Sequence, residues 1–535
     1  MFSPIRKSWS PRTWAIGIFL ITFLLFTAVN LKVPFILDDY YQVRDNPYLT
    51  SLRYLPRLLT TRVLESTQAE TLGSDIYRPV FMASYLLDVQ LFGARPAAFH
   101  IHNNLLHALN VALLFLLAVR FLPLWAAIGG ALVFAVHPMV LEAVTWIGGR
   151  MDLQVCLFSL LHIHLALRLL DPARRSSLWW WILYWLTIPL GLFSKETFVP
   201  VPFLTLAAVA VSRVEWTPVR KRLLVLAALS LITLVPCLLW RNHVIHRNVP
   251  LWDTVVLKNA LTMSRTFLSV FFVPSRSAFH LAYENVSFVL RRDLLPLLAH
   301  AAFWTFLFLV SRRWKAGALG LLTFLGPLLP VALVLDMTAV IGERYFYLPL
   351  AGFSLWFASL AAEGLLRLRT RTSPRFIATV ALCASFWPPL LAVQMAIRTQ
   401  DWRTESRLFE TTVERDPGNY KAYYQLSMAC RRNSDRAGEI RYLKTALNLR
   451  PDYLPALNNL AVYTIQSRNF PEAKELLDRA FKSAPTRAKT AFNYGYYFES
   501  KGDLKQAIPW YRRALELEPK YDKAAEALVR LRAMP

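Results

Sequence analysis

Charged residues are scarce in this chain, and acidic residues are the scarcest. Only 18% of the 535 residues are charged, with 35 acidic side chains against 60 basic ones. A soluble globular protein has about a quarter charged residues, so the composition argues against a wholly soluble protein. The hydrophobic fraction of 55% instead predicts a multi-pass membrane protein with a soluble part.

Cysteine is rare, and the motifs of several enzyme classes are missing. The four cysteines have no zinc-ligand spacing, and a disulfide framework is not expected. The sequence contains no Gly-rich phosphate loop, no GxSxG and no HExxH. His100, His102 and His107 lack the i, i+4 spacing of a helical metal site. No nucleotide, serine-hydrolase or metalloprotease motif is therefore available to explain the function.

The excess of basic residues gives a formal net charge of +25. In a soluble protein this charge would indicate nucleic acid binding. Here the basic residues cluster in alternate short loops between apolar segments, as the positive-inside rule and contact with anionic lipid require. We therefore expect no nucleic-acid partner, and we place these loops in the cytoplasm. They contain Arg120; Arg168, Arg174 and Arg175; Arg213, Arg220, Lys221 and Arg222; Arg312, Arg313 and Lys315; and Arg367, Arg369, Arg371 and Arg375.

About eleven apolar segments predict a helical membrane domain over residues 1–398. The first segment is long and lacks a convincing cleavage pattern, so we expect a retained span with its N-terminus inside. The odd number of spans places the C-terminal region outside. The segment 257–274 contains Arg265, and we interpret it as an interfacial or re-entrant helix because a full span would change the parity. The spans centre on 13–31, 98–119, 122–146, 151–170, 178–193, 198–212, 223–240, 293–310, 316–335, 345–366 and 375–395.

Residues 399–535 have a different composition and a period of 34 residues. Prolines recur with this period, and so do small residues where two helices must approach closely. This tetratricopeptide pattern predicts repeats near 417–450, 451–484 and 485–518 plus a capping helix. The first repeat is atypical, because Glu439 stands where alanines recur. Such arrays commonly bind peptides or protein segments on a concave surface; a packing or dimerisation module is the alternative. The periodic residues are Pro417, Pro451, Pro485 and Pro519; Ala446, Ala480 and Ala514; Ser427, Ala461 and Gly495; and Ala473 and Ala507.

Several charged residues fall at the external ends of the predicted spans. Asp38 and Asp39 follow the first span, in a long external loop over 32–97. Charges this close to the hydrocarbon boundary are costly unless they are paired or functional. We therefore predict one charged site on the external face. The other residues delivered there are Arg78, His137, Glu142, Arg150, Asp152, Lys195, Glu196, Glu343 and Arg344.

Six motifs occur in a recognisable order before the repeats. They are "DDYYQVRDNPYL", "YRPV", "FHIHNNLLHALNVALLF", "FAVHPMVLEAVTWIGGRMD", "SKETFVP" and "ERYFYLPLAGF". In this order the chain resembles the transmembrane and tetratricopeptide-repeat (TMTC) O-mannosyltransferases and their bacterial relatives, in the GT-C glycosyltransferase superfamily. The resemblance implies an all-α fold, with a GT-C-like helical bundle followed by a tetratricopeptide-repeat α-solenoid. One departure is that only about three repeats follow the membrane part, where animal members carry long arrays.

The resemblance also implies a reaction. Mannose or another hexose would pass from a polyprenyl-phosphate donor to a protein Ser/Thr hydroxyl or another external acceptor, with inversion at the anomeric carbon. The reaction needs a general base and positive charge for the departing phosphate. Asp38 is the expected base, with Asp39 orienting the acceptor or sharing the role. The expected donor phosphate ligands are Arg344, Arg150 and Lys195, and the expected sugar- or acceptor-orienting residues are Glu142, Glu196, His137, Glu343 and Arg78.

No cofactor is expected, and we favour a mechanism without metal because an Asp pair offers few of the oxygen ligands that a hard cation takes. The repeats would recruit a protein or peptide acceptor. They would lie in the periplasm if the protein is bacterial, with the spans in the inner membrane, or in the ER lumen if it is eukaryotic. Two alternatives remain open. One is an O-antigen ligase or polymerase type of glycan enzyme, and the other is a membrane-anchored tetratricopeptide-repeat scaffold that would tolerate loss of Asp38 and Asp39.

Overall fold

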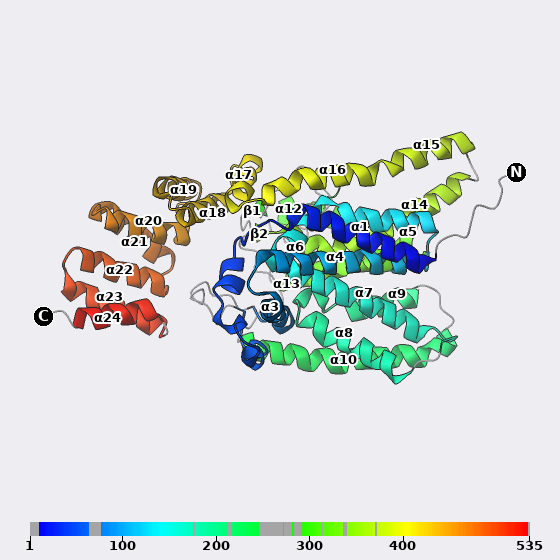
Figure 1. The fold of residues 1–535 in the computed structure, drawn as a ribbon, viewed down its shortest axis with the longest axis horizontal. Coiled ribbons are helices and arrows are strands. Elements are labelled where there is room, and N and C mark those ends of the chain that lie inside the picture. The colour runs from blue at the N-terminus through cyan, green and yellow to red at the C-terminus, as the bar shows by residue number, and fades with distance from the viewer. Residues whose placement is uncertain are drawn as a thin grey trace. The chain divides into compact units, whose positions relative to one another are not determined.

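The computed structural model divides the chain into two compact units (Figure 1). The membrane unit comprises Met1–Ser277 and Tyr283–Thr404, and the repeat unit comprises Ala278–Ala282 and Glu405–Pro535. The predicted boundary at 398/399 precedes this division by one short helix, η10 (Gln400–Trp402). The structure describes residues 10–63, 76–174, 177–211, 216–245, 271, 281–282, 290–312, 314–334, 340–369, 372–519 and 521–532.

The membrane unit is built from apolar helices that run alongside one another (Figure 1). The longer helices are α1 (Pro11–Asn30), α3 (Pro79–Phe92), α4 (Pro96–Ala118), α5 (Leu124–Val136), α7 (Arg150–Leu170), α8 (Leu178–Leu192), α9 (Val201–Val211), α10 (Trp216–Ile245), α12 (Leu290–Ser311), α13 (Lys315–Val334), α14 (Tyr347–Arg369), α15 (Pro374–Ser385) and α16 (Trp387–Thr399). Short elements connect them: η1 (Tyr40–Arg44), η2 (Pro47–Leu49), η3 (Leu52–Tyr54), α2 (Leu55–Leu58), η5 (Pro138–Val140), α6 (Leu141–Thr145), η6 (Ile147–Gly149), η7 (Glu196–Phe198) and η9 (Glu343–Phe346). The short strand β2 (Val340–Ile341) also belongs to this unit, whereas the short strand β1 (Leu281–Ala282) belongs to the repeat unit.

Each of the eleven predicted apolar segments coincides with helix, and the last is broken between α15 and α16. By length and composition, six helices of the described residues can cross a membrane. The number is seven if α5 and the helical segment after it, η5 with α6, form one span bent by 51°. Four further apolar helices are shorter, at 10–17 residues. The chain is therefore a multi-pass membrane protein, while the count of eleven spans stays a prediction. Apart from Phe271, the segment 257–274 lies outside the described residues.

Buried polar side chains join the helices of the membrane unit. Asn30 of α1 and Asn104 of α4 exchange two hydrogen bonds of 2.9 Å. His107 of α4 hydrogen-bonds the Tyr347 hydroxyl of α14 at 2.6 Å. Polar groups inside a membrane domain need such partners because lipid supplies none. These bonds therefore fix how α1, α4 and α14 lie against one another, and with them the loops that follow each helix.

The repeat unit consists of helix pairs, as predicted. After α17 (Glu405–Arg415) come α18 (Tyr420–Arg432) with α19 (Arg436–Leu449), α20 (Leu454–Gln466) with α21 (Phe470–Ser483), α22 (Ala488–Ser500) with α23 (Leu504–Leu517), and α24 (Asp522–Arg532). Ser427 and Ala461 are fully buried at the predicted helix contacts. The atypical Glu439 is also buried, and its carboxylate accepts hydrogen bonds from Arg431 at 2.6 Å and from the Tyr463 hydroxyl.

Candidate active site

Asp38 and Asp39 are neighbours in sequence but face different surroundings. The residue before them, Leu37, has φ +55°, in the left-handed region that a leucine rarely adopts. After this reversal the carbonyl of Asp38 accepts hydrogen bonds from the amides of Tyr41 (3.0 Å) and Gln42 (2.8 Å), which start η1. Asp38 stays exposed, whereas Asp39 is 1% exposed. The backbone turn thus places the two carboxylates in different surroundings.

The Asp39 carboxylate is held by the protein itself. One oxygen accepts a hydrogen bond from the Ile36 amide at 3.1 Å, and the other accepts one from the Gly148 amide at 3.2 Å. Burial raises the pKa of Asp39 well above its ordinary value, against the lowering effect of these bonds. Asp39 therefore ties the first loop to η6, and this geometry supports a positioning role rather than direct contact with an acceptor.

The Asp38 carboxylate is available for chemistry. Within the described part of the chain, no donor hydrogen-bonds its oxygens. The surrounding protein desolvates the carboxylate and raises its pKa, even though the residue keeps an exposed surface, while the positive charge of Arg344 acts in the opposite direction. An accessible carboxylate with a raised pKa is suited to accept a proton.

Arg344 lies in η9, at the start of α14, next to the Asp38 carboxylate. Its guanidinium forms an ion pair with Glu142 of α6, and its amide donates to the same carboxylate at 3.3 Å. The guanidinium carbon lies 4.9 Å from the ring centre of Trp146 and 4.7 Å from that of Tyr345. A Cβ atom on Gly342 would lie 2.5 Å from both the Arg344 guanidinium and the Glu142 carboxylate. A side chain at position 342 would therefore displace the ends of both partners of this ion pair.

Lys195 and Glu196 form separate ion pairs rather than pairing with each other. The Lys195 ammonium lies 2.5 Å from Asp152 and 4.5 Å from the Tyr345 ring centre. Glu196 pairs with Arg78 at 3.0 Å and lies 3.9 Å from Arg241 of α10. Burial alone would raise the pKa of Glu196, but the charges of Arg78, Arg241 and Lys195 outweigh it and lower the pKa to about 2. These ion pairs bring η7, α7 and the first loop together.

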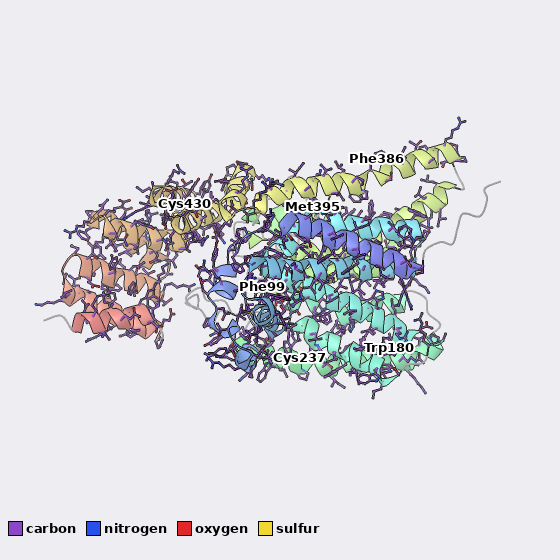
Figure 2. All side chains as sticks on the ribbon, viewed as in Figure 1. Phe99, Trp180, Cys237, Phe386, Met395 and Cys430 are labelled. Carbon is purple, nitrogen blue, oxygen red and sulfur yellow. The ribbon has the colours of Figure 1, made fainter. Side chains whose placement is uncertain are left out.

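Arg150 is fully buried and fully engaged. Its guanidinium pairs with Asp88 of α3 at 2.6 Å, and it donates to Asn103 at 2.9 Å and to the Phe99 carbonyl at 3.3 Å (Figure 2 labels Phe99). A donor phosphate could reach this side chain only if a buried ion pair broke, which is costly. The geometry therefore favours a structural role for Arg150 over the predicted phosphate contact.

His137 and Glu343 are likewise buried and occupied by internal partners. The His137 Nε2 hydrogen-bonds the Phe271 carbonyl at 3.1 Å, and its Nδ1 accepts from the Met139 amide at 3.2 Å. Glu343 pairs with Arg398 of α16 at 3.0 Å. Neither side chain is placed to contact a sugar.

The sequence analysis did not predict three partners in these ion pairs, Asp88, Arg241 and Arg398. Their only signal in the sequence is a charge within or at the end of an apolar helix.

Six of the charged residues described above interact with one another, and we call them the charged cluster. They are Asp38, Glu142, Asp152, Lys195, Glu196 and Arg344. Electrostatic interactions join Asp38 to Arg344, Arg344 to Asp152, and Lys195 to Glu196. Its members come from four parts of the chain that the sequence assigned to one face. The described residues contain no group of three or more His, Cys, Asp or Glu placed to hold a metal. Both oxygens of Asp39 are already used, so the Asp pair does not fit a hard cation, which takes several oxygen ligands.

Two family profiles match the chain. The profile described as dolichyl-phosphate-mannose-protein mannosyltransferase matches residues 78–240, which include Arg78, Glu142, Lys195 and Glu196. The tetratricopeptide repeat profile matches residues 459–525. Two solved structures align with the chain: ArnT from Cupriavidus metallidurans bound to undecaprenyl phosphate (15% identity, 91% of this chain, 81% of that chain, TM-score 0.40), and the oligosaccharyltransferase AglB from Archaeoglobus fulgidus (14% identity, 78% and 60%, TM-score 0.41).

Several sequence relatives are named protein O-mannosyl-transferases. Mouse protein O-mannosyl-transferase TMTC3 is 23% identical over 552 aligned residues, which cover 92% of this chain. Drosophila melanogaster Tmtc1 is 33% identical over 134 residues, 25% of this chain and 16% of its own length. The chain spans 59% of the mouse relative. The predicted resemblance is confirmed: the chain is similar to TMTC proteins over most of its length, and a mannosyltransferase-type profile is followed along it by a tetratricopeptide-repeat profile.

Proposed function

We propose that this protein is a membrane glycosyltransferase that moves a hexose, mannose in the first instance, from a polyprenyl-phosphate donor to a hydroxyl of an external acceptor. The observation that carries the proposal is the Asp38 carboxylate, which is exposed, without a hydrogen-bond donor among the described residues, and next to Arg344. The mannosyltransferase profile over 78–240 and the names of the TMTC relatives support the same reaction class.

The proposed transfer is a single displacement with inversion. Asp38 takes the proton of the acceptor hydroxyl as its oxygen bonds to the anomeric carbon. The bond from that carbon to the phosphate oxygen breaks, and the polyprenyl phosphate leaves with the electron pair. The guanidinium of Arg344, whose charge acts on Asp38, stabilises this developing negative charge. No metal is needed in this scheme, because the arginine supplies the positive charge.

The cation of Lys195 has a supporting role in the same scheme. The Lys195 ammonium pairs with Asp152 and lies over the Tyr345 ring. Its charge therefore adds to the field of Arg344. Glu142 orients Arg344, and Glu196 holds Arg78 in place. We assign Glu142 and Glu196 to the positioning of cations rather than to the binding of sugar hydroxyls, because each already accepts a charged partner.

The location and the acceptor follow from the same proposal. The charged cluster and the repeats lie outside, in the periplasm or the ER lumen, where a lipid-linked sugar is presented. The repeats recruit a protein or peptide substrate, in keeping with the general use of such arrays. The modified group is a Ser or Thr hydroxyl of that substrate.

Single-turnover transfer from a radiolabelled polyprenyl-phosphate mannose tests the proposal. Asp38→Asn keeps the shape and removes the base, so transfer should slow by about 10²–10⁴-fold, with donor affinity little changed because a base acts mainly in the transition state. Arg344→Ala should weaken donor binding and slow transfer. The matched control is Asp45→Asn, an exposed aspartate of the same loop that pairs with Arg44 at 2.8 Å. Full transfer by the Asp38→Asn protein would exclude Asp38 as the base.

A further inference from the structure

A second feature of the membrane unit lies far from the charged cluster. An apolar cavity of about 470 Å³ lies between α7 and α8, where Trp180 is labelled in Figure 2 at the other end of the bundle from Phe99. Leu183, Leu186 and Leu190 line it along α8, together with the Trp180 ring. From Trp180 to Leu190 the helix rises by about 15 Å, so the apolar wall is long enough for an extended alkyl chain.

The threonine and histidine side chains in the wall of this cavity hydrogen-bond within the protein. The Thr187 hydroxyl donates to the Tyr184 carbonyl at 2.6 Å and hydrogen-bonds His162 at 2.8 Å. His164 hydrogen-bonds the Leu113 carbonyl at 2.9 Å. The wall therefore offers a ligand apolar contact but few free hydrogen bonds, which favours a hydrocarbon over a sugar or a peptide.

Two arginines, Arg120 and Arg168, also line the cavity, and within the described residues neither forms an ion pair with a carboxylate, although the charge of Asp171 acts on Arg120. The Arg168 guanidinium lies 3.9 Å over the Trp180 ring centre, and its buried Nε has no hydrogen-bond partner. Arg120 is exposed. Arg174, in the loop after α7, differs from both because it pairs with Asp171 at 2.9 Å. The cavity thus combines an apolar wall with two arginines that are not held in close ion pairs.

We propose that this cavity binds one anionic phospholipid of the leaflet on the basic-loop side, which we predict to be the cytoplasmic one. One acyl chain lies along α8 from Trp180 to Leu190, and the phosphate pairs with Arg120 and Arg168. Basic residues next to a membrane attract anionic headgroups, and guanidinium binds phosphate oxygens in a fork. The apolar wall favours a phospholipid over free phosphate, because only the lipid has an acyl chain to bury. The cavity is on the basic-loop side, whereas the donor of the proposed transfer is presented on the external side.

Lipid binding to the purified, delipidated full-length protein in a neutral detergent tests this proposal without reference to catalysis. Dioleoyl-phosphatidylglycerol is titrated and the bound lipid counted by native mass spectrometry, with dioleoyl-phosphatidylcholine and inorganic phosphate as separate probes. We expect one tightly bound phosphatidylglycerol and weaker binding of the other two. Equal binding of phosphatidylcholine, or equal binding of inorganic phosphate, would overturn the proposal.

Variants locate the binding. Arg120→Gln and Arg168→Gln should each weaken phosphatidylglycerol binding about fivefold, and together by about 25-fold. Leu186→Trp fills the cavity, leaves both arginines in place and should also weaken binding. Arg367→Gln is the matched control, because Arg367 is an exposed arginine of another basic loop that pairs with Glu363. Wild-type affinity in both the double arginine variant and Leu186→Trp would overturn the assignment of the site.

Discussion

At the scale of single residues, the main feature is the contrast between Asp38 and Asp39. The pKa of Asp38 is raised above its ordinary value of 3.8, so the folded protein favours the protonated form. The stability that this carboxyl contributes is complete below pH 3.8 and is lost as the pH rises through its folded-state pKa. The ionised form of Asp38, which the proposed function requires, therefore carries a stability cost.

We predict that Asp38→Asn unfolds at the same or a higher temperature than the wild type at pH 7, and that the difference shrinks towards pH 4. Asp45→Asn should behave in the opposite way, because a hydrogen bond from Arg44 lowers the pKa of Asp45, and its stabilising contribution is lost as the pH falls. Thermal unfolding of the detergent-solubilised protein over this pH range measures both. A clear loss of stability in Asp38→Asn at pH 7 would contradict the raised pKa.

Asp39→Asn should give a different result from Asp38→Asn. An amide offers one acceptor oxygen, so the Ile36 or Gly148 amide would lose its buried partner, at a cost of about 1–3 kcal/mol. We therefore expect Asp39→Asn to lower thermal stability and transfer together. A variant with wild-type stability but no transfer would move the role of base from Asp38 to Asp39.

At the scale of elements, the helix pairs of the repeat unit depend on close contacts. A Cβ atom on Gly495 of α22 would lie 2.5 Å from two ring carbons of Tyr511 in α23, and Tyr511 is fully buried. This contact explains why the periodic small residue is glycine in this repeat.

We predict that Gly495→Ala destabilises this helix pair by about 1–3 kcal/mol through overpacking, and that hydrogen exchange in α22 and α23 of the full-length protein becomes faster. Gly418→Ala is the control, because its Cβ would meet only an Asp416 oxygen at 3.9 Å. Unchanged exchange in Gly495→Ala would mean that Tyr511 can move aside at little cost.

The positions of these elements could be predicted from the sequence, whereas several features of the site could not. Apolar segments and the 34-residue period are local patterns, and the structure has helices at those positions. The different burial of Asp38 and Asp39 depends on the backbone of Leu37, for which no local pattern gives a signal. The Glu142–Arg344 pair joins residues 202 positions apart, and the burial of Arg150 depends on Asp88 of another helix. Long-range pairing of this kind is not encoded in any short stretch of sequence.

At the scale of the whole molecule, the proposed function depends on the orientation of the protein in the membrane. The basic loops and the predicted odd number of spans place the repeats outside. A reporter that is active only in the cytoplasm should be silent when fused after Pro535 and active when inserted next to Arg174. Strong activity after Pro535 would reverse the predicted orientation and would put the charged cluster on the wrong side for a lipid-linked sugar presented outside.

The glycine at position 342 has a consequence for how this protein can change during evolution. Any side chain there would collide at once with Arg344 and with Glu142, which lie in different parts of the chain. A substitution at 342 would therefore shift both ends of this ion pair, and changes at the two partners would be needed to restore the same contact. Among homologues, these three positions should be inherited as one unit, even where the surrounding helices have diverged.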